Sequence, residues 1–433
     1  MSKICFLGAG STVFAKNVLG DSLYVESLKD AKITLIDIDP ERLGDSEKMV
    51  KNLSHSLGAK ATVEGYLGQD ARKAITGADY IVNAIQVGGY EPCTVIDFEI
   101  PKKYGLRQTI GDTLGIGGIF RALRTIPVMI EYCRIIEEVA PEAWLLNYTN
   151  PMAMITGAIL KATEVKTVGL CHSVQVCAPC LCQMLELPED DLRWNIAGIN
   201  HQGWLLSISR HGEDLYPEIK RRAQLPEYNW KDTVRFELMK QFGYYVTESS
   251  EHTSEYVPWF IKSKAPELIE RFNVPLDEYP RRCVAQIEAW NYMRDELVSD
   301  KPLEHERGHE YASYILEAME TGKPFTLGGN VLNKGLITNL PNNACVEVMC
   351  VVDRNGVTPT YTGDLPPQCA ALNRTNINVQ ELTIAAALTG KKEHVYQAAL
   401  LDPHTAAELT IDEIIGLCDD LIEAHGNWLP TLK

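Results

Sequence analysis

Two short stretches of the chain place a thiol and imidazoles where a metal ion could bind. Cys171 ends the apolar run 167–171, His172 follows it directly, and His201 comes shortly after the apolar run 196–199. Thiolate sulfur and imidazole nitrogen are ligands that zinc and other borderline transition ions accept. A catalytic site of this kind keeps an open coordination position for water or substrate. A buried free cysteine and a core histidine would give the same pattern, so these residues alone leave both interpretations open.

A second candidate metal motif is the segment 305–309, which fits the His-Glu-x-x-His pattern of zinc proteases. Working examples lie in a buried apolar helix, whereas charged residues flank this segment on both sides. Gly308 weakens a helix, and Pro302 is typical of a first helical turn. We therefore expect a solvated helix start here rather than a protease site.

The densest group among the 12 cysteines is Cys177, Cys180 and Cys182. A Cys-x-x-Cys pair can be a redox centre or half of a zinc site, but no second pair completes such a site. A helix over 176–185 that uses cysteines as small apolar residues is the favoured interpretation. A chain of this size needs no covalent staples, so we expect reduced thiols and a cytoplasmic location.

Composition and charge narrow the class of protein. A length of 433 residues predicts two domains, and 45% apolar with 23% charged residues is typical of a globular protein. The net charge of −17 disfavours nucleic acid and anionic membranes as partners. No apolar run is long enough for a membrane helix, and the N-terminus leads into a strand without the pattern of a cleavable signal.

The first 37 residues have the pattern of a dinucleotide-binding βαβ unit. An apolar strand leads into a turn of small residues, an amphipathic segment follows, and a second apolar strand ends in an acid. Small residues let the backbone approach a pyrophosphate, and the acid accepts hydrogen bonds from ribose hydroxyls. That acid favours NAD+ over NADP+, because a carboxylate repels a 2′-phosphate. The candidate cofactor-binding residues are Gly8, Gly10, Ser11, Thr12 and Asp37.

Apolar strands alternate with helical segments through the first half of the chain. The expected fold is α/β: a Rossmann-like, doubly wound parallel sheet, followed by a second α+β domain as in lactate and malate dehydrogenases. We place the NAD-binding domain at 1–195 and a catalytic, substrate-binding and oligomerisation domain at 196–433. The expected strands of the sheet are 3–9, 32–37, 61–66, 78–85, 144–148, 167–171 and 196–199.

Several polar segments follow these strands at the edge where open parallel sheets bind ligands. The loop 87–92 and the glycine-rich segment 110–118 permit close approach of a ligand to the backbone. Asn150 precedes a proline at a strand tip and is either a ligand contact or a turn residue. The polar run 247–256, before an aromatic cluster, is unlike an ordinary surface loop.

Taken together, these motifs resemble glycoside hydrolase family four, and most of all its melibiase-type α-galactosidase branch. The resemblance extends from the first strand to residues 402–407 and covers the whole chain. The segments that carry it are 8–12, 88–92, 147–152, 169–175, 198–201 and 249–260. Enzymes of this family are NAD-dependent exceptions among glycosidases.

The resemblance implies a reaction in four steps: oxidation of the sugar at C3, elimination across C1 and C2, addition of water, and reduction. It implies NAD+ as the hydride carrier and a divalent ion, Mn2+ in relatives, bound by Cys171 and His201. Tyr256 takes the position of the base, and Asp112 is expected to assist it through a hydrogen bond. His172 stands where many relatives have the acid for the leaving group, which leaves that role open.

The resemblance also implies the substrate class. Asn150 and Arg281 or Arg282 are expected to bind the sugar. The loop 87–94 has no cation for a 6-phosphate, so a terminal α-galactoside such as melibiose is favoured and an α-galacturonide is the nearest alternative.

Relatives form dimers or tetramers, so a homodimer or homotetramer is expected. A 2-hydroxy-acid dehydrogenase and a non-catalytic NAD-binding regulator remain as alternatives.

Overall fold

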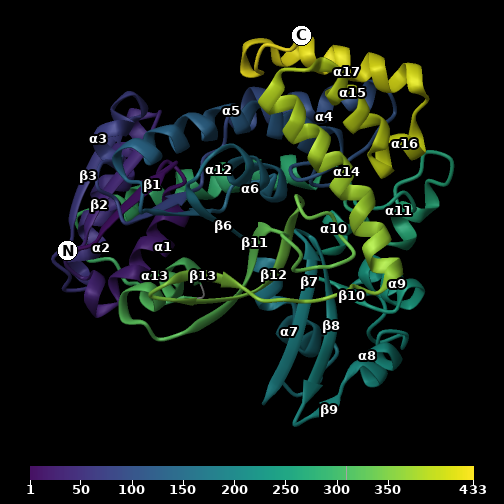
Figure 1. The fold of residues 1–433 in the computed structure, drawn as a ribbon, viewed down its shortest axis with the longest axis horizontal. Coiled ribbons are helices and arrows are strands. Elements are labelled where there is room, and N and C mark those ends of the chain that lie inside the picture. The colour runs from purple at the N-terminus through teal and green to yellow at the C-terminus, as the bar shows by residue number, and fades with distance from the viewer. Residues whose placement is uncertain (309) are drawn as a thin grey trace.

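The computed structural model describes residues 1–308 and 310–433. The N-terminal part of its sheet has parallel strands in the order β3-β2-β1-β4-β5-β6 (Figure 1). The chain runs outward from β1 to β3 and then places β4 on the other side of β1, so the doubly wound α/β prediction is confirmed. These strands are β1 (Lys3–Leu7), β2 (Lys32–Asp37), β3 (Thr62–Leu67), β4 (Tyr80–Asn83), β5 (Trp144–Asn147) and β6 (Lys166–Leu170).

Two apolar clusters lie on opposite faces of this sheet, because side chains alternate along each strand. In β1, Cys5 and Leu7 belong to one cluster, and Ile4 and Phe6 belong to the other. The first cluster includes residues of α3 (Ala71–Ile75), α5 (Gly115–Val139) and α6 (Met152–Ala162). The second includes residues of α1 (Thr12–Leu23), α2 (Pro40–Ser56) and α13 (Tyr311–Thr321).

Beyond β6 the sheet continues with antiparallel strands in the order β11-β12-β7-β8-β10. The prediction that residues 196–199 extend the parallel sheet is wrong, because β7 pairs antiparallel with both β12 and β8. The predicted boundary between residues 195 and 196 falls inside β7 and stays a prediction. The strands are β7 (Leu192–Ile199), β8 (Gln202–Arg210), β9 (Glu213–Asp214), β10 (Tyr245–Val246), β11 (Phe325–Leu332), β12 (Cys345–Asp353) and β13 (Gly356–Pro359).

The C-terminal helices lie at the top and right of Figure 1, and the first three of them pack on α5. The predicted capping box at the start of the last of them is confirmed: the Thr410 side chain accepts from Glu413 N, and the Glu413 side chain accepts from Thr410 N. These helices are α14 (Pro367–Thr389), α15 (Lys392–Leu401), α16 (Pro403–Glu408) and α17 (Ile411–His425). Short helices in the middle of the chain are α8 (Tyr216–Arg222), α9 (Thr233–Phe242) and α11 (Glu267–Arg271).

The two other motifs of the sequence have structural roles. Residues 302–308 form no helix, so the expected solvated helix start is wrong. The His305 side chain is instead only 5% exposed, with Nε2 2.8 Å from Asp21 Oδ1. His309 of the same motif lies outside the described residues. All 12 cysteines are free, and Cys177 and Cys182 are buried on a helix, as predicted, whereas Cys180 on the same helix is exposed. Among the described helices, none is long and apolar enough to cross a membrane.

A buried ion pair ties the C-terminal helix to the nucleotide-binding half. The Asp97 carboxylate, on α4 (Val95–Lys103), accepts from Arg124 Nη1 at 3.1 Å and Nη2 at 2.6 Å. His425 Nε2 at the end of α17 lies 2.9 Å from Asp97 Oδ1. Removing Asp97 would leave the buried Arg124 guanidinium without its counter-charge.

We predict that Asp97→Ala destabilises the fold by about 3–5 kcal/mol, the cost of breaking a buried ion pair from one side. The midpoint of thermal unfolding measures the effect. Glu138→Ala is the matched control, because Glu138 pairs with Arg72 on the exposed surface, where an ion pair contributes little. Equal midpoints for the two variants would contradict the prediction.

Candidate active site

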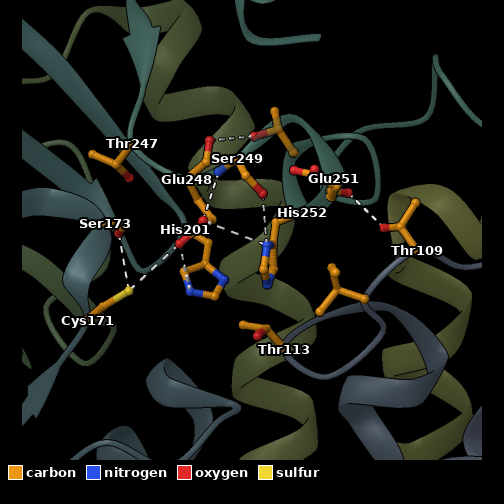
Figure 2. Close-up of polar contacts among 12 residues, drawn as sticks. Thr109, Thr113, Cys171, Ser173, His201, Thr247, Glu248, Ser249, Glu251 and His252 are labelled. Atoms are coloured by element: carbon orange, nitrogen blue, oxygen red, sulfur yellow. Dashed lines mark hydrogen bonds and ion pairs between the residues drawn. The ribbon is translucent and has the colours of Figure 1, made fainter. Parts of the chain in front are cut away.

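Three side chains from separate parts of the chain converge on one point (Figure 2). Cys171, His201 and Glu248 each offer a ligand atom, and these atoms lie within 4.8 Å of one another. Glu248 Oε2 is 4.0 Å from Cys171 Sγ and 3.4 Å from His201 Nε2. The structure therefore brings the predicted metal ligands Cys171 and His201 together. It adds Glu248, which the sequence analysis did not single out.

Strand ends position these three side chains. Cys171 directly follows β6 and is the N-cap of α7 (His172–Met184). His201 occupies the tight turn between β7 and β8 with φ of 62°, a left-handed conformation that costs a residue other than glycine roughly 1–3 kcal/mol. Glu248 follows β10, which pairs with β8, and Thr247 N continues that pairing to Gly203 O. The register of β10 against β8 thus sets Glu248 beside His201.

The charges of the cluster suit a divalent cation. Burial raises the pKa of the Cys171 thiol, and the nearby Glu248 carboxylate raises it further. Burial lowers the pKa of His201 to about 4, which keeps the imidazole neutral and able to bind a metal. His201 Nδ1 is buried without a hydrogen-bond partner among the described residues. A sulfur, a neutral nitrogen and a carboxylate oxygen are a fitting donor set for a borderline transition ion, which would also favour the thiolate.

His252, on α10 (Ser250–Thr253), lies beside this cluster (Figure 2). Its Nδ1 is 3.8 Å from Glu248 Oε1, and its Nε2 is 3.7 Å from Asp112 Oδ1. Burial alone would lower the pKa of His252, but Glu248 and Asp112 outweigh it and raise the pKa to about 9. The sequence analysis missed both His252 and Glu248. Their spacing of four residues within the polar run 247–256 is the signal that could have found them.

Asp112 and Asn150 form the next part of the site. Asn150 Nδ2 donates to Asp112 Oδ2 at 3.2 Å, so two predicted site residues are in contact. Burial would raise the pKa of Asp112, but His252 and Arg121 hold it well below its usual range. The loop before Asp112 is fixed by the buried Glu255 carboxylate, which accepts from the backbone N–H groups of 109–111.

Tyr256 is buried, and its ring centroid lies 6.2 Å from that of His201. Its hydroxyl donates to the Asn200 carbonyl at 3.2 Å. The expected hydrogen bond from Tyr256 to Asp112 is not among the contacts of the described residues. The Asp112 carboxylate instead accepts from Thr113 and Asn150 and lies 3.7 Å from His252 Nε2. Burial, followed by the charge of Asp112, raises the pKa of Tyr256 well above its usual value.

The remaining predicted residues lie around the cluster rather than in it. His172 Nε2 is 3.0 Å from Glu310 Oε2, and its ring packs against Tyr148 and Tyr311. Arg281 is exposed and bonds Glu278 and the Leu276 carbonyl. Arg282 also bonds Glu278 and approaches Glu251 Oε1 at 3.8 Å. Within the described residues, no hydrogen bond or ion pair joins these three side chains to Cys171, His201 or Glu248.

The predicted nucleotide-binding turn has the expected geometry. Gly8 has φ of 84°, and a Cβ there would lie 2.8 Å from the Ala84 backbone. Gly10 N donates to Asp37 Oδ2 at 2.6 Å, so a hydrogen bond joins the turn to the carboxylate at the end of β2. Ser11 is the N-cap of α1, and Thr12 Oγ1 donates to the Gly10 carbonyl at 3.3 Å.

A cavity of about 390 Å³ lies beside the end of β2. Apolar side chains line it, with Gln69 and Glu131 as polar groups; the apolar ones are Ile38, Leu67, Val128, Tyr132 and Ile135. A pocket of apolar side chains with a few polar groups is a suitable place for a flat aromatic base. The glycine turn, the Asp37 carboxylate and this pocket together fit a dinucleotide.

Comparison with known proteins agrees with this geometry. An α-galactosidase of Bacillus subtilis is 60% identical over the full length of both chains. An α-galactosidase of Rhizobium meliloti is 36% identical and aligns with 99% of this chain and 89% of its own. The solved structure of a 6-phospho-α-glucosidase from gut microorganisms, in complex with NAD and Mn2+, covers 100% of both chains. Its TM-score is 0.79 at 23% identity, a likeness of fold.

The family profiles cover both halves of the chain. The description "Family 4 glycosyl hydrolase" matches residues 3–187, and "Family 4 glycosyl hydrolase C-terminal domain" matches residues 196–405. The first range contains the nucleotide-binding turn and Cys171, and the second contains His201, Glu248 and Tyr256. With these profiles and a relative 60% identical over its whole length, this chain belongs to family 4 of the glycosyl hydrolases.

Proposed function

We propose that this enzyme hydrolyses terminal α-galactosides such as melibiose, with NAD+ and Mn2+ as cofactors, by oxidation, elimination, addition and reduction. The observation that carries the proposal is the cluster of Cys171, His201 and Glu248, which offers a metal three different donor atoms. The same chain has the fold and the turn of a dinucleotide-binding protein. The α-galactosidase name of the 60% identical relative supports the substrate class.

The residues present fit both cofactors. Gly8, Gly10, Ser11 and Thr12 would hold the pyrophosphate at the start of α1, and Asp37 would accept from the ribose hydroxyls. Cys171, His201 and Glu248 would hold the metal. When bound, NAD+ supplies reversible hydride transfer at C3 of the sugar, and the divalent ion supplies Lewis-acid charge beside C2 and C3.

The chain's own groups then orient the sugar and move its protons. Asn150 would hydrogen-bond sugar hydroxyls, with its amide fixed by Asp112. Tyr256 is the proposed base for the C2 proton. Burial raises the pKa of its hydroxyl, which donates to the Asn200 carbonyl, so its ionisation would need the charge of the bound divalent ion. His172 is the proposed proton donor to the leaving group, since its half-exposed ring beside Glu310 can exchange protons with solvent. Arg282 approaches Glu251, whose carbonyl accepts from Thr109, whereas Arg281 bonds Leu276 and Glu278, so Arg282 is the stronger candidate for a sugar contact.

The names of the relatives favour a neutral sugar over a uronic acid. The α-galactosidases are 60% and 36% identical to this chain, whereas an α-galacturonidase of Bacillus subtilis is 30% identical. An α-galactoside is therefore the proposed substrate, and an α-galacturonide is the alternative.

Two properties of the whole molecule belong to the same proposal. A free cysteine as metal ligand works only while it is reduced, so a cytoplasmic location suits the enzyme. We also propose that the enzyme acts as a homodimer or homotetramer.

The direct test is hydrolysis of 4-nitrophenyl α-galactoside with NAD+, Mn2+ and thiol reductant each withheld in turn. We expect activity to fall to background without either cofactor and to decline on oxidation of Cys171. The matching α-galacturonide, assayed in parallel, should be the poorer substrate. Turnover indifferent to NAD+ would reject the mechanism, and stoichiometric release of NADH would identify a dehydrogenase instead.

The third ligand can be tested separately from activity. We predict that Glu248→Gln weakens Mn2+ binding on the order of 10- to 100-fold, because an amide oxygen lacks the charge of the carboxylate. The measurement is a titration of free Mn2+ by electron paramagnetic resonance. The matched control is Glu251→Gln, three residues along the same segment and outside the donor cluster. Equal Mn2+ affinities for the two variants would remove Glu248 from the ligand set.

A further inference from the structure

A second cavity of about 390 Å³ lies beside His172. Three parts of the chain line it: helix α1, the start of α7 and the residues just before α13. Helices α1 and α13 pack against each other at the left of Figure 1. Asn17 and Asp21 are four residues apart on α1, so they face the cavity from the same side of the helix. Its volume is within the range of about 300–1,000 Å³ that is usual for small-molecule sites.

Acidic side chains dominate the lining of this cavity. Among the described residues, four carboxylates and one ammonium group line it: Asp21, Glu304, Glu306, Glu310 and Lys16. Glu304 and Glu306 are exposed, so their charges face the open side of the cavity. A phosphate or carboxylate group that entered would lose hydration and meet like charges. The cavity therefore disfavours anionic ligands.

One oxygen of the Asp21 carboxylate has no partner in the wall of the cavity. Asp21 Oδ1 lies 2.8 Å from His305 Nε2 and accepts from Gly308 N at 3.0 Å. The Asp21 side chain is 1% exposed, and its Oδ2 is buried without a hydrogen-bond partner among the described residues. A buried acceptor without a donor costs free energy. The cavity therefore favours a ligand that carries hydrogen-bond donors.

The spread of the carboxylates favours a ligand with several hydroxyl groups over a metal ion. In the part of the chain that the structure describes, the carboxylates and histidines of this cavity form no group of three ligand atoms within 4.8 Å of one another. Cys171, His201 and Glu248 do form such a group. One ion therefore cannot bridge the acids of the cavity, whereas hydroxyls on different sides of a sugar can each donate to a different carboxylate.

We propose that this cavity binds the leaving group of the glycoside and that its carboxylates select an uncharged leaving group with several hydroxyls. His172 connects the cavity to the active site, because it lines the cavity and directly follows the metal ligand Cys171. The inference rests on the proposed function, in which His172 gives its proton to the glycosidic oxygen. That oxygen belongs to the leaving group, so the leaving group must lie beside the His172 ring.

Two substrates with the same galactosyl group test the proposal. Melibiitol and melibionate are melibiose with its glucose unit reduced to an alcohol or oxidised to a carboxylate. Both have an open-chain leaving group, and they differ in its charge. With NAD+, Mn2+ and thiol reductant present, kcat/KM of the wild type should be roughly 10- to 100-fold higher for melibiitol, because the carboxylate meets like charges in the cavity. Equal kcat/KM for the two substrates would overturn the proposal.

A double variant assigns this preference to the cavity. Glu304→Gln combined with Glu306→Gln should reduce the preference for melibiitol by roughly 10-fold, since the amides keep the side-chain size and remove two negative charges. The matched control combines Glu26→Gln with Glu142→Gln. It removes the same charge from two side chains that are each 88% exposed and do not line the cavity. Equal preferences in the two double variants would also overturn the proposal.

Hydrolysis of 4-nitrophenyl α-galactoside by the same wild-type preparation separates the two levels of the proposal. A wild type that hydrolyses it but cleaves melibiitol and melibionate equally well would reject the leaving-group site and keep the proposed function. A wild type that hydrolyses no galactoside would reject the proposed function, and the leaving-group site with it.

Discussion

The crowding of donor groups at Cys171, His201 and Glu248 is the constraint on which the rest of the site depends. A thiol, an imidazole and a carboxylate lie within 4.8 Å of one another in a mostly buried space. Burial keeps the thiol protonated and the imidazole neutral, so the cluster holds donor atoms without a cation of its own. A bound divalent cation would stabilise this arrangement, because it attracts all three donor atoms and favours the thiolate form of Cys171.

The architecture explains how such a cluster can be held. Cys171 comes from the end of the parallel half of the sheet, whereas His201 and Glu248 come from the antiparallel half. The hairpin of β11 and β12 joins the halves, because β11 pairs with β6 and β12 pairs with β7. The left-handed conformation of His201 is tolerated since strands hold the chain on both sides of it. Rigid sheet edges thus fix donors that would separate if they lay on free loops.

A second layer of polar residues connects the cluster to Asn150. His252 lies between Glu248 and Asp112, and Asp112 fixes the Asn150 amide. The positive charge favoured on His252 balances the two carboxylates on either side of it. Metal ligands are oriented by such neighbours, and removal of a neighbour commonly weakens metal binding about 10- to 100-fold. The site is therefore one electrostatic unit that extends from Cys171 to Asn150.

The sequence by itself determined the α/β class, the nucleotide-binding turn at Gly8 and Gly10, and the pairing of Cys171 with His201. Those features depend on local patterns: strand periodicity, small residues in a turn, and distinctive motifs around each ligand. Only the tertiary structure decided that β7 is antiparallel, that Glu248 and His252 join the site, and that His305 is buried against Asp21. The sequence also favoured a bond between Tyr256 and Asp112, whereas packing directs the tyrosine hydroxyl to the Asn200 carbonyl. The physical reason is that strand order and side-chain partners arise from contacts between residues far apart in the chain, which no local pattern of residues encodes.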